Sequence, residues 1–156
     1  YYQQLVRYHG GVPLVDRPYD LGEADYLAPR NTMEECINFI VKDCDEAAKL
    51  LKGKNLAAGR ASEAASLALK SRILLYAASD LYDAATAKAK SSTHAAFAKS
   101  ELMGLTSGSR ADRWQKAKDA AKAVLDLPGY GYQLTLSAPA AKDDELHERV
   151  AVQKRG

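Results

Sequence analysis

The sequence is poor in residues that cross-link a chain or embed it in a membrane. It has two cysteines, Cys36 and Cys44, and both fall in one predicted helix. Two positions eight residues apart on a helix are separated by about 12 Å, too far for a disulfide bond. Both cysteines are therefore predicted to be small core residues. No run approaches the roughly 20 apolar residues of a membrane-spanning helix, so none is predicted.

No sign of charge dominates either. The chain has 22 Lys and Arg residues against 20 Asp and Glu residues, a net charge of +2. This balance does not favour binding to nucleic acid or to a membrane surface. A mixed, solvated surface is the expected reading, and no nucleic-acid partner is predicted.

The signatures of catalysis and of metal binding are also missing. The three histidines, His9, His94 and His147, form no His-x-x-x-His pair and have no cysteine at zinc spacing. The acidic run at residues 43–46 lies in a predicted helix and lacks the calcium-loop pattern. No Gly-x-Ser-x-Gly elbow or phosphate-binding glycine loop occurs. The sequence therefore predicts no enzyme, no metal site and no cofactor.

What the chain does contain is alanine and other good helix formers. Apolar residues make up 47% of 156 residues, which favours closely packed helices and an all-α fold in one domain. We expect a helical region over residues 1–136 and a polar, loosely ordered tail over residues 137–156. Because the first residues read like the middle of an element, we expect a piece of a longer chain.

The first predicted element is a helix end over residues 1–8, in which Tyr1, Leu5 and Tyr8 share one face. An exposed face of this kind invites self-association. Gly10 and Gly11 end the helix, because glycine readily adopts the left-handed conformation of a helix terminus. Pro13 then predicts an extended segment over residues 12–15, and residues 16–29 are predicted to form a loop.

Two strong helices follow, and together they predict a helical hairpin. The first covers residues 32–52, and Thr32 with Glu35 has the spacing of a capping box at its start. One buried stripe steps by three and four along it: Met33, Ile37, Ile40, Cys44, Ala47 and Leu51. The second helix covers residues 62–82, is apolar on more than one side, and is therefore predicted to be central.

The remainder is less regular. Residues 84–109 are rich in Ala, Ser, Thr and Lys, which predicts a helix continuation followed by a flexible excursion. A third strong helix is predicted over residues 111–127. Its apolar stripe of Trp114, Ala117, Ala121 and Val124 predicts that Trp114 packs in the core rather than serving as a platform for a sugar. The loop tyrosines Tyr19 and Tyr26 are better candidates for ligand contact, and packing the loop against the helices is the alternative use of the same rings.

Four blocks of the sequence, taken in order, resemble one known family. The first is Tyr2-Gln3-Gln4-Leu5-Val6-Arg7-Tyr8-His9-Gly10-Gly11-Val12-Pro13-Leu14-Val15, a helix that ends in a Gly-Gly-Val-Pro turn. The second is Arg30-Asn31-Thr32 followed by residues 39–47. The third is Gly59-Arg60-Ala61-Ser62 leading into residues 64–76. The fourth runs from Trp114 to Leu125 and on to Gly129-Tyr130. Together they resemble SusD/RagB proteins, with departures at His9 and Cys44.

The resemblance implies an all-α fold of tetratricopeptide-like hairpins, with short extended segments and a long loop. It implies non-catalytic binding of oligosaccharide or polysaccharide at the cell surface, and delivery to a SusC-like TonB-dependent transporter. It also implies a lipid-anchored location on the outer membrane of a Bacteroidetes-type cell. The residues leave one alternative open, a helical-repeat scaffold that mediates protein–protein interaction.

Overall fold

The computed structural model describes residues 1–22, 27–130, 134–136 and 150–152. The chain divides into two compact units, Tyr1–Val124 and Leu125–Gly156. The predicted boundary between residues 136 and 137 stays a prediction, because most of the tail lies outside the described residues.

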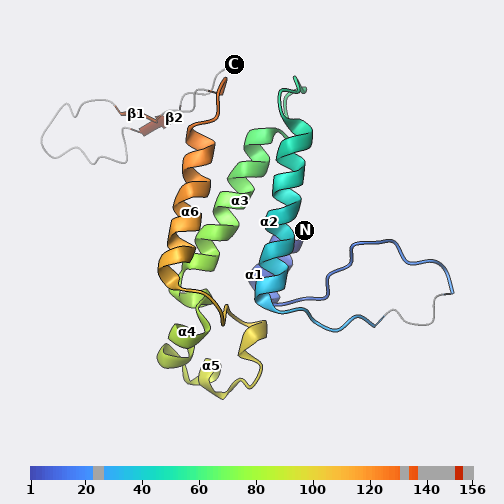
Figure 1. Cartoon of the computed structure of the whole chain (residues 1–156), viewed down its shortest axis with the longest axis vertical. Helices are drawn as coiled ribbons and strands as arrows, with labels where there is room; N and C mark the ends of the chain where they lie inside the picture. Colours follow the sequence, from blue (N-terminus) through green and yellow to red (C-terminus); the bar gives the residue numbers. More distant parts are fainter. Residues whose placement is uncertain (23–26, 131–133, 137–149, 153–156) are drawn as a thin grey trace, which may run out of the picture. The chain divides into compact units, whose positions relative to one another are not determined.

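The described chain is built from helices, which confirms the predicted all-α class (Figure 1). The only strands among these residues form a short antiparallel pair in the second unit, β1 (Leu134–Leu136) with β2 (Val150–Val152). The helices, with two 3₁₀ turns, are α1 (Tyr2–His9), α2 (Met33–Leu51), α3 (Glu63–Ala78), η1 (Asp80–Tyr82), α4 (Ala84–Lys90), α5 (Ser92–Ala96), η2 (Ser100–Leu102) and α6 (Arg110–Leu125).

Helix α2 begins where the capping box predicts. The Glu35 backbone N–H donates to the Thr32 hydroxyl at 3.2 Å, and the Thr32 N–H donates to the Glu35 carboxylate at 2.8 Å. These bonds satisfy two backbone donors that would otherwise lack partners at the helix start. The hydrogen bond from the Thr32 N–H is also the main reason that the pKa of Glu35 is lowered.

The buried face of α2 matches the predicted stripe along most of the helix. Its buried residues are Met33, Cys36, Ile37, Ile40, Cys44 and Ala48. Both cysteines are buried free thiols, as predicted. Towards the C-terminal end the stripe drifts by one position, so Ala48 is buried where Ala47 was predicted. A helix turns about 100° per residue, so a stripe that steps by three and four drifts slowly around the helix axis. Over several turns the predicted stripe therefore separates from the face that contacts the core.

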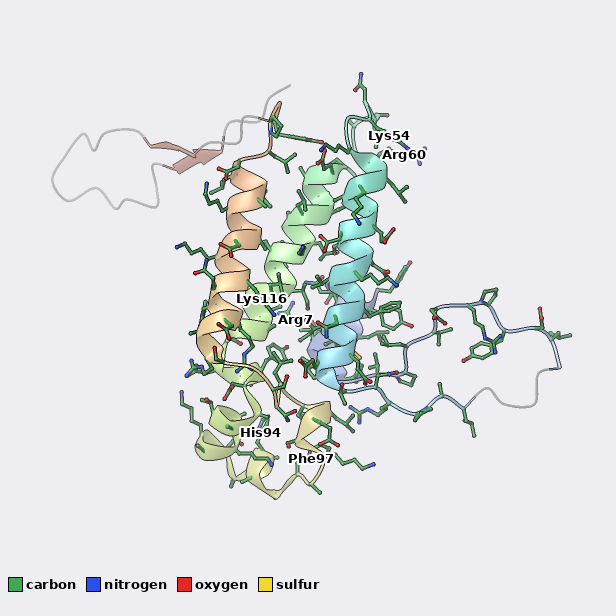
Figure 2. The ribbon with its side chains drawn as sticks, viewed as in Figure 1. Arg7, Lys54, Arg60, His94, Phe97 and Lys116 are labelled. Atoms are coloured by element: carbon green, nitrogen blue, oxygen red, sulfur yellow. The ribbon has the colours of Figure 1, made fainter. Side chains whose placement is uncertain are left out.

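Helices α2 and α3 form the predicted hairpin. Gly59, with φ +85°, and the neighbouring Arg60 lie in the loop that joins them (Figure 2). Helix α3 ends at Ala78, four residues before the predicted end. The reason is local, because the Ser79 hydroxyl and N–H both donate to the Tyr76 carbonyl and turn the chain into η1.

The core of the first unit lies where α1, α2 and α3 meet. It is formed by Val6, Met33, Cys36, Ile37, Ile40, Cys44, Ile73, Ala77 and Leu105. Three of the helices contribute along their own apolar faces, and Leu105 comes from the segment after η2. Tyr2, Val12 and Leu14 pack against this cluster from outside, so the extended segment around Pro13 is held to the helices.

The Gly10–Gly11 turn is where three distant segments meet. A Cβ atom at Gly10, where φ is +72°, would lie 2.2 Å from the Leu102 carbonyl oxygen. At Gly11 it would lie 2.0 Å from the Asn31 carbonyl oxygen. The Gly11 N–H also donates to the Leu102 carbonyl at 2.6 Å. Close backbone approach, more than turn geometry alone, therefore requires this pair of glycines.

The sequence predicts that residues 84–109 continue the helix and then form a flexible excursion. Helix follows at the start, but the remainder is not an irregular excursion. The segment forms α4, α5 and η2, and its end returns to its start. The Leu105 N–H donates to the Tyr82 carbonyl at 2.7 Å, and the Ala84 N–H donates to the Leu105 carbonyl at 3.0 Å. Side-chain caps from Asp83 and Ser91 start the two short helices. These contacts join residues about twenty positions apart, so a local composition of Ala, Ser and Lys does not reveal them.

The predicted core packing of Trp114 is also wrong. Its side chain is 46% exposed, while Ala117 and Ala120 are the buried residues of α6. Arg113, one position earlier, has the buried side chain instead, with 11% exposure. The helix is rotated by about one residue from the predicted face, because a paired arginine takes the place expected for the indole ring.

No helix among the described residues is both long enough and apolar enough to cross a membrane.

Candidate functional site

A long loop leaves the helices after Val15 and returns at Arg30, and both ends are fixed. At its end, Asn31 accepts a hydrogen bond from the Leu14 N–H at 3.0 Å. The Arg30 guanidinium donates to the carbonyls of Gly11 and His9, both at 2.7 Å. The loop is thus anchored by side chains on its C-terminal end that bind the backbone of its N-terminal end.

Tyr19, one of the two predicted ligand-contact residues, lies in the described part of this loop. Its ring is 36% exposed, and the Arg17 guanidinium lies over it at 4.7 Å from the ring centroid. Such a cation–π contact orients the ring. The other predicted residue, Tyr26, lies outside the described residues. The loop therefore presents an aromatic ring beside charged side chains, as many binding loops do.

An open hollow beside α1 combines aromatic and polar side chains. It measures about 670 Å³, part of it open to solvent. Aromatic rings and hydrogen-bonding side chains in one hollow are what pyranose recognition requires, because a ring stacks on the sugar's C–H face while polar groups bind its hydroxyls. The lining residues are Tyr1, Tyr2, Gln3, Ile40, Asp43, Cys44, Ala47, Ser66 and Leu69.

Tyr2 connects this hollow to the loop. Its hydroxyl accepts from the Val15 N–H at 2.7 Å and lies 3.3 Å from the Val15 carbonyl, to which it can donate. Its ring meets Phe39 edge to face, with centroids 5.2 Å apart. A ring held at both its edge and its hydroxyl is a rigid wall. We call this hollow the α1 surface; Tyr19 lies further along the loop and does not line it.

The floor of the hollow is apolar at Cys44. Burial raises the pKa of this thiol, and the neighbouring carboxylates of Asp45 and Asp43 add to the effect. Cys44 is therefore a neutral thiol at physiological pH and behaves as a small hydrophobic residue. It provides shape to the hollow and no nucleophile.

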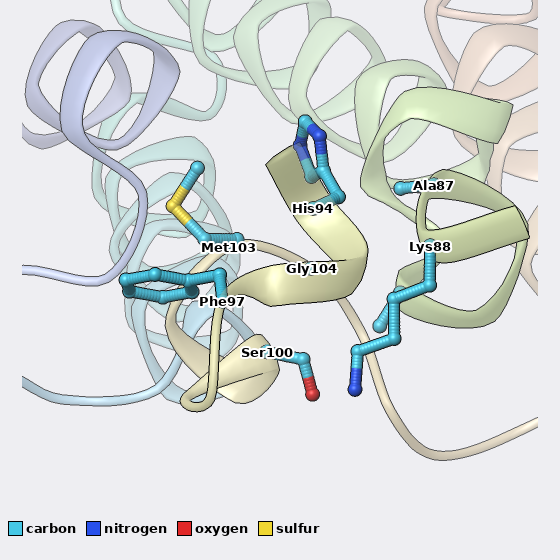
Figure 3. Close-up of a pocket in the computed structure, with 8 residues that line it drawn as sticks. Ala87, Lys88, His94, Phe97, Ser100, Met103 and Gly104 are labelled. Carbon is cyan, nitrogen blue, oxygen red and sulfur yellow. The ribbon is translucent and has the colours of Figure 1, made fainter. Parts of the chain in front are cut away.

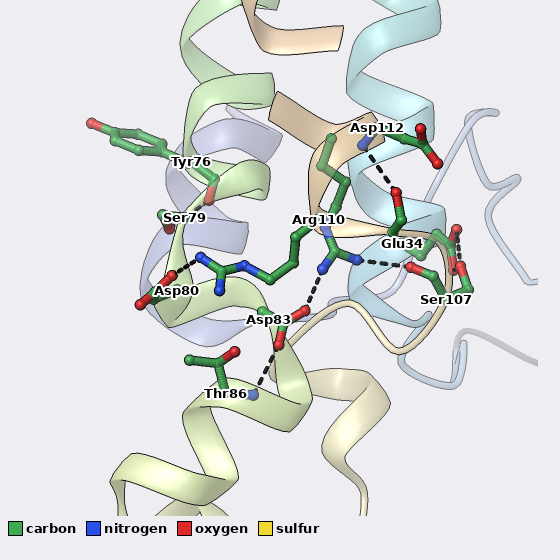
Figure 4. Close-up of polar contacts among 11 residues, drawn as sticks. Glu34, Tyr76, Ser79, Asp80, Asp83, Thr86, Ser107, Arg110 and Asp112 are labelled. Atoms are coloured by element: carbon green, nitrogen blue, oxygen red, sulfur yellow. Dashed lines mark hydrogen bonds and ion pairs between the residues drawn. The ribbon is translucent and has the colours of Figure 1, made fainter. Parts of the chain in front are cut away.

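A second polar feature lies where α4 and α6 begin (Figure 4). Asp83 pairs with the Arg113 guanidinium and accepts a hydrogen bond from the Thr86 N–H at 2.8 Å. Hydrogen bonds from Thr86 are the main cause that lowers the pKa of Asp83, and Arg113 adds to it. Arg113 also donates to the Ser107 carbonyl at 2.8 Å. These contacts pair the two nearly buried charges and fix α6 to the start of α4, while the buried Arg113 Nε has no hydrogen-bond partner among the described residues.

Two further contacts surround that pair. Asp80 pairs with Lys90 at 2.6 Å and with Arg110, and its hydrogen bond with Lys90 is the main cause that lowers its pKa. The Ser107 hydroxyl donates to Glu34 of α2 at 2.7 Å. The cluster joins α2, η1, α4 and α6, so we assign it a structural role.

A small, mostly apolar hollow lies within the segment that contains α4 and α5 (Figure 3). It measures about 230 Å³, and its walls include His94, Phe97 and Met103. His94 is half-buried, with its Nδ1 3.1 Å from the Ser91 hydroxyl. Lys88 and Ser100 also line this hollow, but the imidazole pairs with the Ser91 hydroxyl, so these groups do not form a hydrogen-bonded reactive set.

No group of three or more His, Cys, Asp or Glu residues within the described ranges could hold a metal ion.

The sequence analysis missed the hollow beside α1. The tyrosines of α1 were noted as one helical face, but Asp43 lies about forty residues further along the chain and Ser66 more than sixty. They meet because α1 packs on the α2–α3 hairpin. A stretch with two tyrosines and two glutamines in Tyr1-Tyr2-Gln3-Gln4 is the one local signal, and its composition alone does not distinguish a binding face from a packing face.

Comparison with known proteins places the fold in context. No protein-family model and no curated protein matches the chain. Several solved structures are similar to it. BT4246 matches 83% of this chain at 24% sequence identity, with a TM-score of 0.64. A SusD-like protein (BF3747) from Bacteroides fragilis matches 56% of this chain at 27% identity, with a TM-score of 0.45.

These likenesses concern the helical fold. The chain covers 22% of BT4246 and 21% of BF3747, so it spans about a fifth of each. One of these structures is described as SusD-like. The match to BT4246 carries the fold, and the match to BF3747 adds no argument at its lower TM-score.

Proposed function

We propose that this chain is the helical part of a SusD-like protein that binds oligosaccharide or polysaccharide without catalysing its cleavage. The observation that carries the proposal is the α1 surface, in which aromatic rings and polar side chains share one hollow. The resemblance in four sequence blocks and the likeness in fold support the same class of protein.

Within the α1 surface, each kind of residue has a separate role in the proposal. Tyr1 offers an exposed ring for stacking, while Asp43 and Ser66 offer acceptors and a donor for sugar hydroxyls. Outside the α1 surface, Tyr19 adds a second ring from the anchored loop. Tyr26 belongs to the same proposal on sequence grounds.

The biological setting follows from the same resemblance and is part of the proposal. The whole protein would be lipid-anchored on the outer face of a Bacteroidetes-type outer membrane. It would pass captured glycan to a SusC-like TonB-dependent transporter. Both statements concern a longer protein. This chain spans about a fifth of BT4246 and of BF3747.

Calorimetric titration of the chain with a panel of neutral α- and β-linked oligosaccharides tests the sugar-binding step. We expect at least one member to bind, and we expect Tyr1→Ala and Tyr19→Ala to weaken it by about tenfold each, because each removes a stacking surface. Asp43→Asn should weaken it by less, since the amide keeps an acceptor.

Matched variants make this test specific. Tyr8 is 71% exposed on α1 and Glu46 is exposed on α2, and neither lines the hollow. Tyr8→Ala and Glu46→Gln should therefore leave affinity unchanged. Absence of binding across the panel, or equal losses in the test and control variants, would contradict the proposal.

Self-association of the chain is a further part of the proposal. Tyr1, Leu5 and Tyr8 are exposed along α1, with 108%, 43% and 71% exposure. Sedimentation velocity at increasing concentration should show association that the double variant Leu5→Glu/Tyr8→Glu abolishes, because like charges placed on an apolar contact oppose burial. A concentration-independent monomer would contradict it.

A further inference from the structure

A trough runs along α3 between α2 and α6. It consists of two hollows of about 590 and 920 Å³, each partly open to solvent, that share Asn38, Leu74 and Lys116 and therefore lie next to each other. Lys116 projects from α6 on the side that faces α3 (Figure 2). The structure leaves this trough open along several turns of helix.

The lining of the trough is mixed, with an aliphatic strip beside polar and charged side chains. The strip includes Ile37 and Val41 of α2, Leu67 and Leu74 of α3, and Ala120 of α6. Among the residues that line the two hollows there is no Tyr, Phe or Trp. A sugar site without an aromatic ring lacks its usual stacking surface. An aliphatic strip of this length is instead suited to the apolar stripe of a helix, the helix-in-groove mode of recognition.

The charges on the rim favour a basic occupant. Lys70 is neutralised by Asp45 at 2.7 Å, and Arg113 is neutralised by Asp83. The remaining charged lining residues are three carboxylates and one ammonium group, an excess of two negative charges. They are Glu34, Asp112, Asp119 and Lys116. None of the four forms an ion pair with another residue in the described part of the chain.

We propose that the trough binds a basic amphipathic helix of a partner protein. Its apolar stripe lies against the walls that α2, α3 and α6 provide, and Lys or Arg residues beside that stripe reach Glu34, Asp112 and Asp119. The α1 surface has no part in this binding, so the proposal is independent of sugar recognition. The sequence leaves open the alternative of a protein-binding scaffold. This proposal assigns that scaffold a defined surface and a chemical class of partner.

Fluorescence anisotropy with two labelled peptides of about 18 residues tests the proposal. Both carry Leu at i, i+3, i+4 and i+7 spacing, one flanked by Lys and its twin by Glu. We expect the Lys peptide to bind the chain at least about tenfold more tightly at low salt. The preference should shrink as salt is raised, because exposed charges are screened. Equal affinity, or preference for the Glu twin, would overturn the proposal.

Two pairs of variants locate the binding. Ala123 lines the trough and Ala121 is exposed without lining it. Ala123→Trp should therefore block the peptide, and Ala121→Trp should not. The double variant Asp112→Lys/Asp119→Lys should reverse the preference between the twins, while the exposed Glu46→Lys leaves it unchanged. Circular dichroism confirms that each variant is folded before it is compared.

The remaining outcomes are also decisive. If Ala121→Trp and Ala123→Trp weaken binding equally, the peptide binds elsewhere and the proposal fails. If an oligosaccharide that binds the chain displaces the peptide, the trough is not a separate protein-binding surface. If no oligosaccharide binds but the peptide results hold, sugar recognition fails and the trough proposal stands.

Discussion

Asp83 and Arg113 form an ion pair across 30 residues of sequence, with 12% and 11% of their side chains exposed. Asp83 also caps α4, while Arg113 belongs to the first turn of α6. One carboxylate therefore starts one helix and fixes the rotation of another. The environment of the Asp83 carboxylate predicts how the folded state responds to mutation and to acid.

Replacement of Asp83 by Asn should destabilise the chain strongly. The amide can still accept a hydrogen bond from the Thr86 N–H, but it leaves the Arg113 guanidinium nearly buried without its counter-charge. Loss of one partner of a buried pair costs about 3–5 kcal/mol. Urea unfolding followed by circular dichroism measures the change. Asp80→Asn, at an exposed pair, should cost much less, and equal losses would contradict a special role for Asp83.

Stability should fall in acid. The pKa of Asp83 is lowered by hydrogen bonds from Thr86, and that of Glu35 by the Thr32 N–H, so both bind protons less readily when folded. The unfolded chain then takes up more protons as pH decreases. The contribution is complete above the ordinary values of 3.8 and 4.5 and is lost as pH falls through the lowered folded values.

Urea midpoints at a series of pH values between 2 and 7 measure this dependence. The Asp83→Asn/Glu35→Gln double variant should show a flatter decline than the parent chain. A parent chain whose stability rises towards pH 2 would contradict the assignment of these two carboxylates.

Gly11→Ala should destabilise the chain more than Gly59→Ala. A Cβ atom at Gly11 would overlap the Asn31 carbonyl oxygen, which belongs to backbone and cannot move away cheaply. Gly59 has φ +85° and open space around it, so alanine there meets only the left-handed strain of about 1–2 kcal/mol. Thermal unfolding of the two variants gives the comparison. A larger loss at Gly59 would show that turn conformation, and not close approach, sets the requirement.

Neither cysteine should react readily in the folded chain. Burial raises the pKa of both thiols, and at Cys36 the hydrogen bond from the Val12 N–H, at 3.4 Å, opposes this rise only in part. A thiol-specific chromogenic reagent at neutral pH should therefore react slowly with the native chain and fully with two thiols in urea. Rapid reaction of either thiol in the native state would show that the core around α2 opens easily.

Local sequence predicted much of the helical framework. The capping box of Thr32 and Glu35 located the start of α2 to within one residue, because the cap is formed by residues three positions apart. The apolar stripe of α2 predicted its buried face, and Gly10 with Gly11 predicted the end of α1. Each of these features depends on neighbours in sequence, which is why the sequence reveals them.

Predictions failed where long-range contacts decide. The segment of α4 and α5 was predicted to be flexible from its local composition. Its closure at Leu105 depends on backbone hydrogen bonds to residues around twenty positions away, which that composition does not reveal. Trp114 looked buried because it is the largest apolar residue of α6. The Arg113–Asp83 pair turns the helix so that the arginine is buried and the indole is exposed.

The sequence by itself determined where the main helices form and which class of fold they build, because helix propensity, caps and apolar spacing are local properties. Only the tertiary structure decided which face of α6 is buried, how Tyr1 meets Asp43 and Ser66, and where a trough with an aliphatic strip stays open between α2 and α6. The physical reason is that these arrangements depend on packing and charge pairing between residues 20 to more than 60 positions apart.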